Sequence, residues 1–305
     1  MGKPDDYSLS NSKRLLIRRH AEKALQDADA LGCFPTPIAA VMDAAKVVVS
    51  EQPLIDEDFL AKLRRKSHEA GKSLLRALEK VLGVLHVAAR IIYLDQTIHI
   101  AKRTFLKLHE TGHAVLPWQR DIFVVTEDCE KTLAPEVAEQ FEREASAFAA
   151  DVLFQLDSFT EEAHQSPFNI LVPVKLAKRY GASIYMSVRR YVTTHHRACA
   201  VLVLEPPIAC ERRGFVSNYR RFVASPEFQR QFGTLNWPES YGPDDEIGAA
   251  VPIGGRKMSG SREIALVDRN GTRHRCMAEA FTQGHQVFIL IHAVATLTSS
   301  NIFIP

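Results

Sequence analysis

The hydrophobic positions divide the chain into a first part with helical spacing and a later part with short apolar runs. Between residues 11 and 30, apolar residues such as Ile17, Ala21 and Leu25 recur at helical intervals among charged residues. Similar spacing, with proline and glycine as start and stop signals, predicts helices at 38–45, 67–82, 102–116 and 135–154, and two short helices within 171–192. Strands are expected at 47–49 and, as a pair around a turn at 95–96, at 91–94 and 97–100. Residues 122–126 are either a strand or an extended loop.

After about residue 198 the pattern changes. Apolar runs at 200–204, 249–253, 263–267 and 287–291 alternate with loops rich in Gly, Pro, Asn and Asp. The loop 254–262, which reads GGRKMSGSR, matches no phosphate-binding spacing and is interpreted as a flexible hairpin loop. This alternation predicts a separate β-rich domain.

Composition and charge are those of a globular protein. Hydrophobic residues make up 46% and charged residues 24% of the chain, and 38 basic minus 36 acidic residues leave a net charge of +2. Any basic surface must therefore come from local clustering. The five cysteines are scattered without a C-x-x-C pair, which argues against both a thiolate zinc finger and a disulfide framework. The polar start MGKPDDYSLS, and a longest apolar run too short to span a bilayer, predict a cytoplasmic protein with no membrane partner.

Residues 109–113 carry the clearest chemical motif, His-Glu-Thr-Gly-His, inside the predicted helix 102–116. Residues four apart lie on the same helix face, so His109 and His113 can both reach one ion at about 2.0–2.1 Å. Glu110 is placed to take a proton from metal-bound water, as H-E-x-x-H requires. Gly112 costs the helix roughly 1 kcal/mol relative to alanine, which the close approach of a substrate or a strand at this position would explain. The motif predicts a zinc site.

Two histidines leave a catalytic zinc site one protein ligand short. The longer pattern H-E-x-x-H-x-x-G-x-x-H would supply a third histidine, but Gln119 occupies its place. The helix 135–154 is the best remaining supplier. Glu142 lies on one flank of its apolar stripe, beside the small Ala145, and Glu144 lies on the opposite flank. Spacing alone leaves both carboxylates as candidates.

These two stretches together resemble a known family. Residues 103–113 read RTFLKLHETGH and residues 141–150 read FEREASAFAA, a pair similar to the motifs of the ImmA/IrrE metallopeptidases. The resemblance covers roughly residues 20–195. It departs at Ser146, where the family usually has Asn or Asp, and at Leu153-Phe154-Gln155, where the family usually has Leu-Met-Pro.

The resemblance implies an α+β architecture in three parts. A zincin-like metallopeptidase domain at 11–165 is followed by a helix-turn-helix-like segment at 166–197 and a β-rich sensor or regulatory domain at 198–305. In the IrrE branch this last domain is GAF-like, which is an analogy at the level of the fold. The implied substrate is a protein partner, a helix-turn-helix transcriptional repressor whose cleavage switches on a stress or mobile-element response.

The resemblance also assigns roles to single residues. It selects Glu142 as the third ligand beside His109 and His113, with one zinc per chain, although manganese can share such ligands. Ser146 takes the place of a residue that orients a ligand histidine, so the departure there bears on metal affinity. Zinc would polarise the scissile carbonyl, and Glu110 would act as general base on water and then protonate the leaving amine.

A basic stretch follows the implied protease domain. Residues 171–200 contain six Lys and Arg residues and no acidic residue, so DNA binding is one interpretation and a solvated or protein-contacting face is the other. The candidates for this contact are Lys175, Lys178, Arg179, Arg189 and Arg190. The rival function for the whole chain is therefore a DNA- or protein-binding regulator with a structural or degenerate metal site. His195-His196 is interpreted as a loop pair, because no partner pattern for a metal accompanies it.

Overall fold

The computed structural model describes residues 9–50, 83–86, 90–94, 99–120 and 135–294. The chain forms two compact units. The first consists of Asp6–Phe159 with Ala177–Ser183, and the second of Thr160–Leu176 with the residues from Ile184 on. The mixture of helices and sheets confirms the predicted α+β class. The finer three-part division, with boundaries after residues 165 and 197, stays a prediction.

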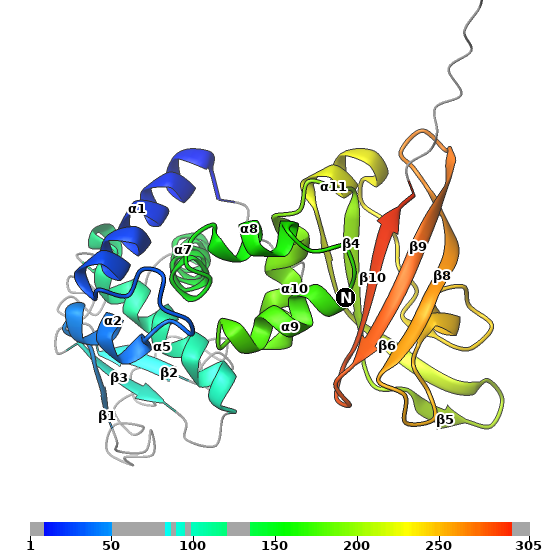
Figure 1. The fold of residues 1–305 in the computed structure, drawn as a ribbon, viewed down its shortest axis with the longest axis horizontal. Helices are drawn as coiled ribbons and strands as arrows, with labels where there is room; N and C mark the ends of the chain where they lie inside the picture. Colours follow the sequence, from blue (N-terminus) through cyan, green and yellow to red (C-terminus); the bar gives the residue numbers. More distant parts are fainter. Residues whose placement is uncertain (1–8, 51–82, 87–89, 95–98, 121–134, 295–305) are drawn as a thin grey trace, which may run out of the picture. The chain divides into compact units, whose positions relative to one another are not determined.

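The first unit combines a small sheet with helices. Its elements are α1 (Asn11–Asp27), α2 (Ile38–Ala44), β1 (Val48–Ser50), β2 (Gly83–His86), β3 (Ile91–Leu94), α5 (Ile100–Val115) and α7 (Pro135–Leu153) (Figure 1). The sheet has the order β1-β3-β2, with β1 parallel and β2 antiparallel to β3. Helix α5 packs against both this sheet and α7, and α7 also packs against α1. The predicted helices at 102–116 and 135–154 are thus the two that pack together.

The strand pairing in this unit differs from the prediction. We expected 91–94 to form a hairpin with 97–100, but β3 pairs with β1 and β2, and Ile100 begins α5. The apolar Ile98 and Ile100 suggested a strand, whereas Ile100 belongs to the amphipathic pattern of the helix that follows. The predicted helix 67–82 and the strand or loop at 122–126 lie outside the described residues.

Gln155 ties the end of α7 to the loop that follows α1. Its side-chain nitrogen donates to the carbonyl of Ala30 over 3.0 Å and to the hydroxyl of Thr36 over 2.9 Å, and its oxygen accepts from the Gly32 amide over 2.9 Å. The side chain is buried, so these bonds satisfy every polar atom it brings into the core. This position is one of those at which the chain departs from the ImmA/IrrE pattern, and the contacts supply a local reason for glutamine there.

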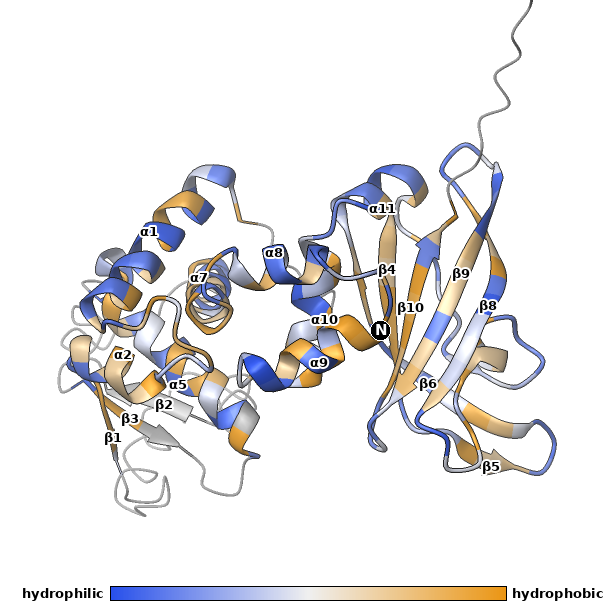
Figure 2. Ribbon diagram, viewed as in Figure 1, coloured by the Kyte–Doolittle hydropathy of each residue, from blue (hydrophilic) through white to orange (hydrophobic). Residues whose placement is uncertain are grey.

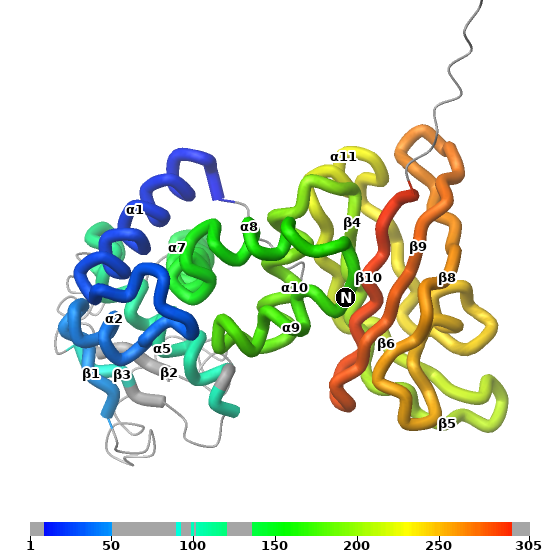
Figure 3. The backbone as a smooth tube through the Cα atoms, viewed as in Figure 1, coloured from blue at the N-terminus to red at the C-terminus, as the bar shows by residue number. Residues whose placement is uncertain are grey.

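The second unit consists of short helices followed by a sheet. Helices α8 (Ser158–His164) and α9 (Leu171–Arg179) cross the division between the units, and α10 (Ile184–Thr193) follows them. The remaining elements are β4 (Cys199–Leu204), β5 (Ile208–Cys210), β6 (Gly214–Ala224), α11 (Pro226–Phe232), β7 (Ser240–Tyr241), the 3-10 helix η1 (Gly248–Ala250), β8 (Met258–Val267), β9 (Arg273–Thr282) and β10 (Val287–Ala293). The two short helices predicted within 171–192 are confirmed as α9 and α10. The chain can be followed through them into β4 in Figure 3.

The sheet of the second unit is antiparallel, with the order β5-β6-β4-β10-β9-β8 and β7 paired to β6. All six residues of β4 are buried, as are the first five of β10, which places both strands at the centre of the unit. Figure 2 shows both strands mostly in hydrophobic colours, with more hydrophilic colour along β8. The prediction of a β-rich second part is confirmed, and its resemblance to a GAF domain stays a prediction.

One predicted strand in this unit is wrong, and four strands, β5, β6, β7 and β9, were not predicted. Residues 249–253 do not form a strand, since Gly248–Ala250 is a 3-10 helix and a turn follows. Gly248 packs so closely on Gly242 that a Cβ atom there would lie 1.8 Å from the Gly242 carbonyl oxygen. The middle of the run is apolar because Ala250, Val251 and Pro252 are buried in this turn, whereas Ile253 is exposed. The strands β6 and β9 escaped prediction because their buried residues alternate with exposed polar ones.

Candidate metal centre

The helix α5 presents the His-Glu-Thr-Gly-His motif toward the interior of the first unit. His109 and His113 are 8% and 5% exposed, and the neighbouring Leu108 and Ala114 are buried in the same helix. The two imidazoles lie one helical turn apart, with ring centroids separated by 4.9 Å. The motif is therefore at a packed helix face.

Gly112 is required at its position by the close approach of α7. A Cβ atom on Gly112 would lie 3.1 Å from Cδ1 of Phe148 and 3.2 Å and 3.3 Å from the backbone Cα and O of Ala145. The contact that we expected from the cost of glycine in a helix is thus made by another helix. Because α5 and α7 meet here, the residue one turn before Ala145 on α7, Glu142, is brought over the two histidines.

His109, His113 and Glu142 form one cluster of potential ligands. Nε2 of His109 lies 3.1 Å from Oε2 of Glu142 and 3.2 Å from Nε2 of His113, which lies 3.5 Å from Oε1 of Glu142. In a tetrahedral site with bonds of about 2.0–2.1 Å, ligand atoms lie about 3.3 Å apart. Two imidazoles and one carboxylate with a fourth, open direction are the donor set of a catalytic zinc site. The residues fit a zinc ion, and their role as ligands stays a prediction.

Ser146 lies beside the first of these histidines. Its hydroxyl oxygen is 3.2 Å from Nδ1 of His109, on the side of the ring opposite to Glu142. A hydrogen bond at Nδ1 leaves Nε2 free to bind a metal and fixes the ring orientation. The serine therefore occupies the position that the family resemblance gave to Asn or Asp, with a shorter side chain.

Gln119 holds the second histidine in the same way. Nδ1 of His113 donates to Oε1 of Gln119 over 2.7 Å, and Nε2 of Gln119 donates to Oε2 of Glu144 over 2.8 Å and to the Phe141 carbonyl over 3.2 Å. Two acceptors at the amide nitrogen fix which way the amide points, so its oxygen must face His113. The proton of His113 is thereby placed on Nδ1 and the Nε2 lone pair faces Glu142.

Glu144, which the spacing had left as a candidate ligand, lies among hydrogen-bond donors instead. The side chain is fully buried and accepts hydrogen bonds from nitrogens of three residues at 2.6–2.8 Å, with an ion pair at 3.2 Å. The partners are Trp118, Gln119, Gln140 and Lys13. Burial opposes ionisation, but these hydrogen bonds outweigh it and lower the pKa of Glu144. Sequence reasoning missed Gln119 and Glu144 as supports, and the only signal was that Gln119 stood where a longer motif has histidine.

Comparison with known proteins points to a family for residues 57–191. The family model of the IrrE N-terminal-like domain, peptidase M78, matches residues 57–191, which include both the 109–113 motif and Glu142. The chain carries an IrrE N-terminal-like domain. The predicted relation to the ImmA/IrrE family is confirmed, and the family points to a peptidase.

One solved structure is similar to this chain over nearly its whole length. It is a Mycobacterium tuberculosis transcriptional regulator, with 11% sequence identity and a TM-score of 0.49 over 99% of this chain and 96% of that one. No curated protein sequence matches the chain at a significant level. The family model therefore carries the assignment.

The charges in the IrrE N-terminal-like domain favour a cation at the cluster. Burial opposes protonation of His113, but the adjacent Glu142 outweighs it and raises the pKa of His113. Burial likewise opposes ionisation of Glu142, but the hydrogen bonds with His109 and His113 outweigh it and lower its pKa. The cluster thus attracts positive charge. Burial raises the pKa of Glu110, which is 8% exposed, and the neighbouring histidines counteract part of this effect.

The basic residues predicted to contact DNA or a partner differ in exposure. Lys175, Lys178 and Arg179 are exposed on α9, and the Arg179 guanidinium lies 4.6 Å from the centre of the Phe34 ring. On α10, Arg189 is buried and Arg190 is half-buried. Two of the five candidates therefore lack the exposure that a nucleic-acid contact needs, and binding by this segment stays a prediction.

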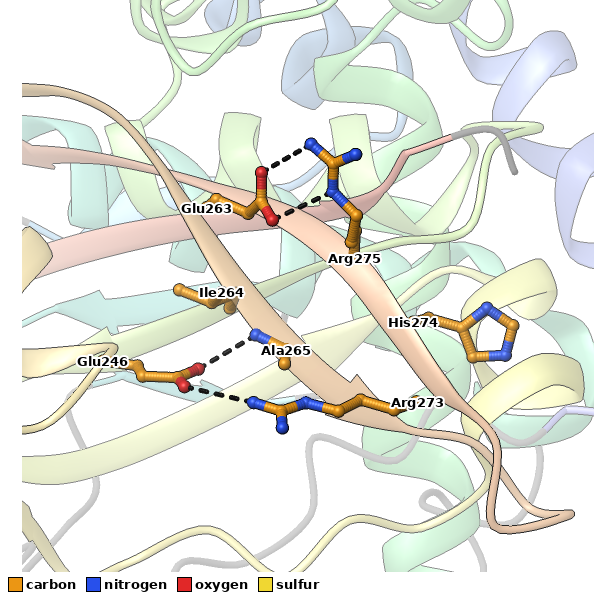
Figure 4. Close-up of a pocket in the computed structure, with 7 residues that line it drawn as sticks. All are labelled: Glu246, Glu263, Ile264, Ala265, Arg273, His274 and Arg275. Carbon is orange, nitrogen blue, oxygen red and sulfur yellow. Dashed lines mark hydrogen bonds and ion pairs between the residues drawn. The ribbon is translucent and has the colours of Figure 1, made fainter. Parts of the chain in front are cut away.

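A separate cavity of about 390 Å³ lies in the sheet of the second unit. Figure 4 shows its lining, in which Glu263 pairs with Arg275 at 2.6 Å and 2.9 Å, and Glu246 accepts from the Ala265 amide at 2.9 Å and pairs with Arg273 at 3.7 Å. The acidic and basic groups are matched within the cavity, so it indicates no charged ligand. In the described part of the chain, no helix has the length and apolar character that a membrane crossing requires.

Proposed function

We propose that the IrrE N-terminal-like domain is a zinc-dependent endopeptidase. The observation that carries the proposal is the convergence of His109, His113 and Glu142, with a tetrahedral spacing of 3.1–3.5 Å between their ligand atoms. The match of residues 57–191 to the model of a peptidase family supports it. The buried Glu110 next to His109 completes the set of groups that such a reaction needs.

In this proposal each residue of the site has a separate role. A zinc ion held by the cluster would polarise the scissile carbonyl and acidify water. Glu110 accepts the proton of the attacking water and passes it to the leaving amine, and the burial that raises its pKa makes it a stronger base for the first of these steps. Ser146 and Gln119 keep the two imidazoles oriented throughout.

The proposed substrate is a partner transcriptional repressor with a helix-turn-helix fold, whose cleavage would switch on a stress or mobile-element response. The support for this step is the resemblance to the ImmA/IrrE family. Because a peptidase of one repressor must recognise a folded protein, binding and cleavage are expected to depend on surfaces outside the metal cluster.

The test uses the whole chain with a purified candidate repressor. Glu110→Gln should keep about one zinc at the cluster and lower the cleavage rate by about 10²–10⁴-fold, the usual contribution of a general base. The matched control is Glu139→Gln, which makes the same change at an exposed position of α7. EDTA should abolish cleavage and zinc should restore it. Cleavage by Glu110→Gln at the parental rate would refute the assignment.

The rival function is a DNA- or protein-binding regulator whose metal site is structural. The exposed Lys175, Lys178 and Arg179 are the residues on which it would depend. If it is correct, replacing these three residues by alanine should abolish the response in cells while Glu110→Gln leaves it unchanged. The peptidase function predicts that Glu110→Gln abolishes the response.

A further inference from the structure

Three histidines outside this cluster come together in the second unit. His164 is the last residue of α8, and His195 and His196 follow Thr194, the first residue after α10. The ring centroid of His164 lies 4.9 Å from that of His195 and 5.1 Å from that of His196. The centroids of His195 and His196 are 4.6 Å apart. One ring nitrogen from each histidine lies within 4.8 Å of the other two. This grouping could not be predicted from the sequence, because His164 and His195 are 31 positions apart (195 − 164).

A hydrogen bond between two threonines positions the group. The hydroxyl of Thr160 donates to that of Thr194 over 3.0 Å, and Thr194 in turn donates to the Arg190 carbonyl over 2.7 Å. Thr160 and His164 are four residues apart and share a face of α8. Because Thr194 directly precedes His195, this bond brings His164 over the histidine pair.

The surroundings of the group combine a buried ligand with two exposed ones. His195 is 5% exposed and lies against Phe168 and Tyr191, with ring centroids 4.7 Å and 5.3 Å away. Burial, followed by the neighbouring histidines, lowers the pKa of His195 to about 3, so its ring is neutral at physiological pH. His164 and His196 are exposed, which leaves an ion a path of entry and a direction for water.

We propose that His164, His195 and His196 form a second metal site, which binds a divalent transition-metal ion such as zinc. Three imidazoles and one open position suit zinc, cobalt, nickel or copper, whereas magnesium and calcium prefer oxygen ligands. Ligand atoms in a tetrahedral zinc site lie about 3.3 Å apart, so the rings must draw together from their present separation. The two exposed rings can make this movement, since little packs against them.

The proposal has a local consequence at Arg197. Its backbone amide donates to Nδ1 of His195 over 3.0 Å, which places the ring proton on Nε2. Coordination through Nδ1 replaces this hydrogen bond, and coordination through Nε2 moves the proton to Nδ1 and breaks it. Metal binding at His195 must therefore change the environment of the Arg197 amide in either case.

The site also joins two parts of the second unit. The metal would connect the end of α8 to the short segment that leads into β4, which begins at Cys199. An ion that binds the folded chain and not the unfolded chain raises the melting temperature in proportion to the logarithm of its concentration. The site is thus expected to stabilise the second unit, and not to take part in peptide hydrolysis.

The first experiment measures metal content on the untagged full-length chain. After dialysis against zinc, the parent should hold two zinc ions per chain, and His164→Ala, which removes an exposed ring, should hold one. The double variant with His109→Ala and His113→Ala should also hold one zinc ion. Adding His164→Ala to this double variant should remove that ion. The control is His285→Ala, an exposed histidine elsewhere in the second unit, which should hold two. These numbers follow from one ion per three-ligand site.

The second experiment measures affinity and location. Loss of an outer hydrogen-bond partner weakens metal binding by about 10–100-fold, so loss of the ligand in His164→Ala or His196→Ala should weaken it by at least about 100-fold. Zinc should also shift the NMR signal of the Arg197 amide in the variant that lacks His109 and His113. An unchanged Arg197 signal, or a zinc content that does not fall in His164→Ala, would overturn the second site. Neither result would affect the proposed peptidase, whose test depends on Glu110.

Discussion

The side-chain nitrogen of Gln119 donates to Oε2 of Glu144 over 2.8 Å, and this bond determines which side of the amide faces His113. Glu144, a buried carboxylate outside the proposed ligand set, therefore orients His113, which is one of the proposed ligands. Ligand histidines in metal sites depend on such partners, because a ring that can rotate or change tautomer binds metal more weakly. The support of His113 is thus a chain of two residues that the H-E-x-x-H motif does not contain.

Replacing Gln119 by leucine should weaken zinc binding by about 10–100-fold, because Nδ1 of His113 loses its acceptor. Zinc affinity can be measured by competition with a chelator on the full-length chain. Gln229→Leu makes the same change at an exposed position of α11 and should leave the affinity unchanged. Equal affinities of both variants would show that Gln119 does not orient the ligand.

Replacing Gly112 by alanine should destabilise the first unit although alanine favours helices. The added Cβ atom would lie 3.2 Å and 3.3 Å from backbone atoms of Ala145, which cannot move without shifting α7. Overpacking of this kind costs about 1–3 kcal/mol, against a gain of about 1 kcal/mol in helix propensity. We expect a lower melting temperature and weaker zinc binding, since α7 carries Glu142.

The comparison for this variant is Gly260→Ala, because no atom lies within 4 Å of a Cβ atom built on Gly260. It should not weaken zinc binding. A Gly112→Ala chain that is more stable than the parent would mean that α7 yields at this contact, and that the spacing of the two helices is not fixed by glycine.

Much of the candidate site could be predicted from the sequence because its parts lie on helices. A spacing of four residues places His109 and His113 on one face, and this holds wherever the helix packs. The choice between Glu142 and Glu144 could not be made from spacing, since it depends on how α7 is rotated against α5. That rotation is set by the contact of Gly112 with Ala145, which involves residues 33 positions apart (145 − 112).

In the sheet of the second unit, prediction succeeded for the two strands that are buried on both faces and for the second half of β8, which is partly exposed. The strands β4 and β10 appear as continuous apolar runs because every side chain meets the core. In β9, by contrast, the buried Cys276, Ala278 and Ala280 are small and alternate with residues such as Glu279. Their burial depends on partners across the sheet, so hydrophobicity along the chain gave no signal.

Asp268 gives the second unit a dependence on pH. Its carboxylate accepts hydrogen bonds from His274 at 2.8 Å and from the Asn270 and Thr272 amides at 2.8 Å and 2.9 Å. The hydrogen bond from His274, and then those from the backbone, lower the pKa of Asp268. An unfolded aspartate has a pKa of about 3.9, so this stabilisation is present above about pH 4 and is lost as the pH falls through the lower folded value.

Asp268→Asn should therefore be less stable than the parent at about pH 7, and the difference should shrink at about pH 3. Urea unfolding at the two pH values measures both differences. Asp244→Asn, at an exposed position of the same unit, should match the parent throughout. A difference that stays constant between the two pH values would show that the charge of Asp268 does not contribute.

Glu144→Gln tests the buried carboxylate directly, because it keeps the shape of the side chain but turns one oxygen into a donor. That donor would face the nitrogens of Trp118 and Gln119, which now have a carboxylate as acceptor. Hydrogen bonds to a charged group contribute about 1.5–3 kcal/mol each, so we expect a loss of about 3 kcal/mol in the free energy of unfolding. Glu139→Gln, exposed on the same helix, should stay within about 0.5 kcal/mol of the parent. Because Gln119 also loses its anchor, zinc affinity should fall together with stability, and a variant that lost stability but kept full zinc affinity would separate Glu144 from the metal centre.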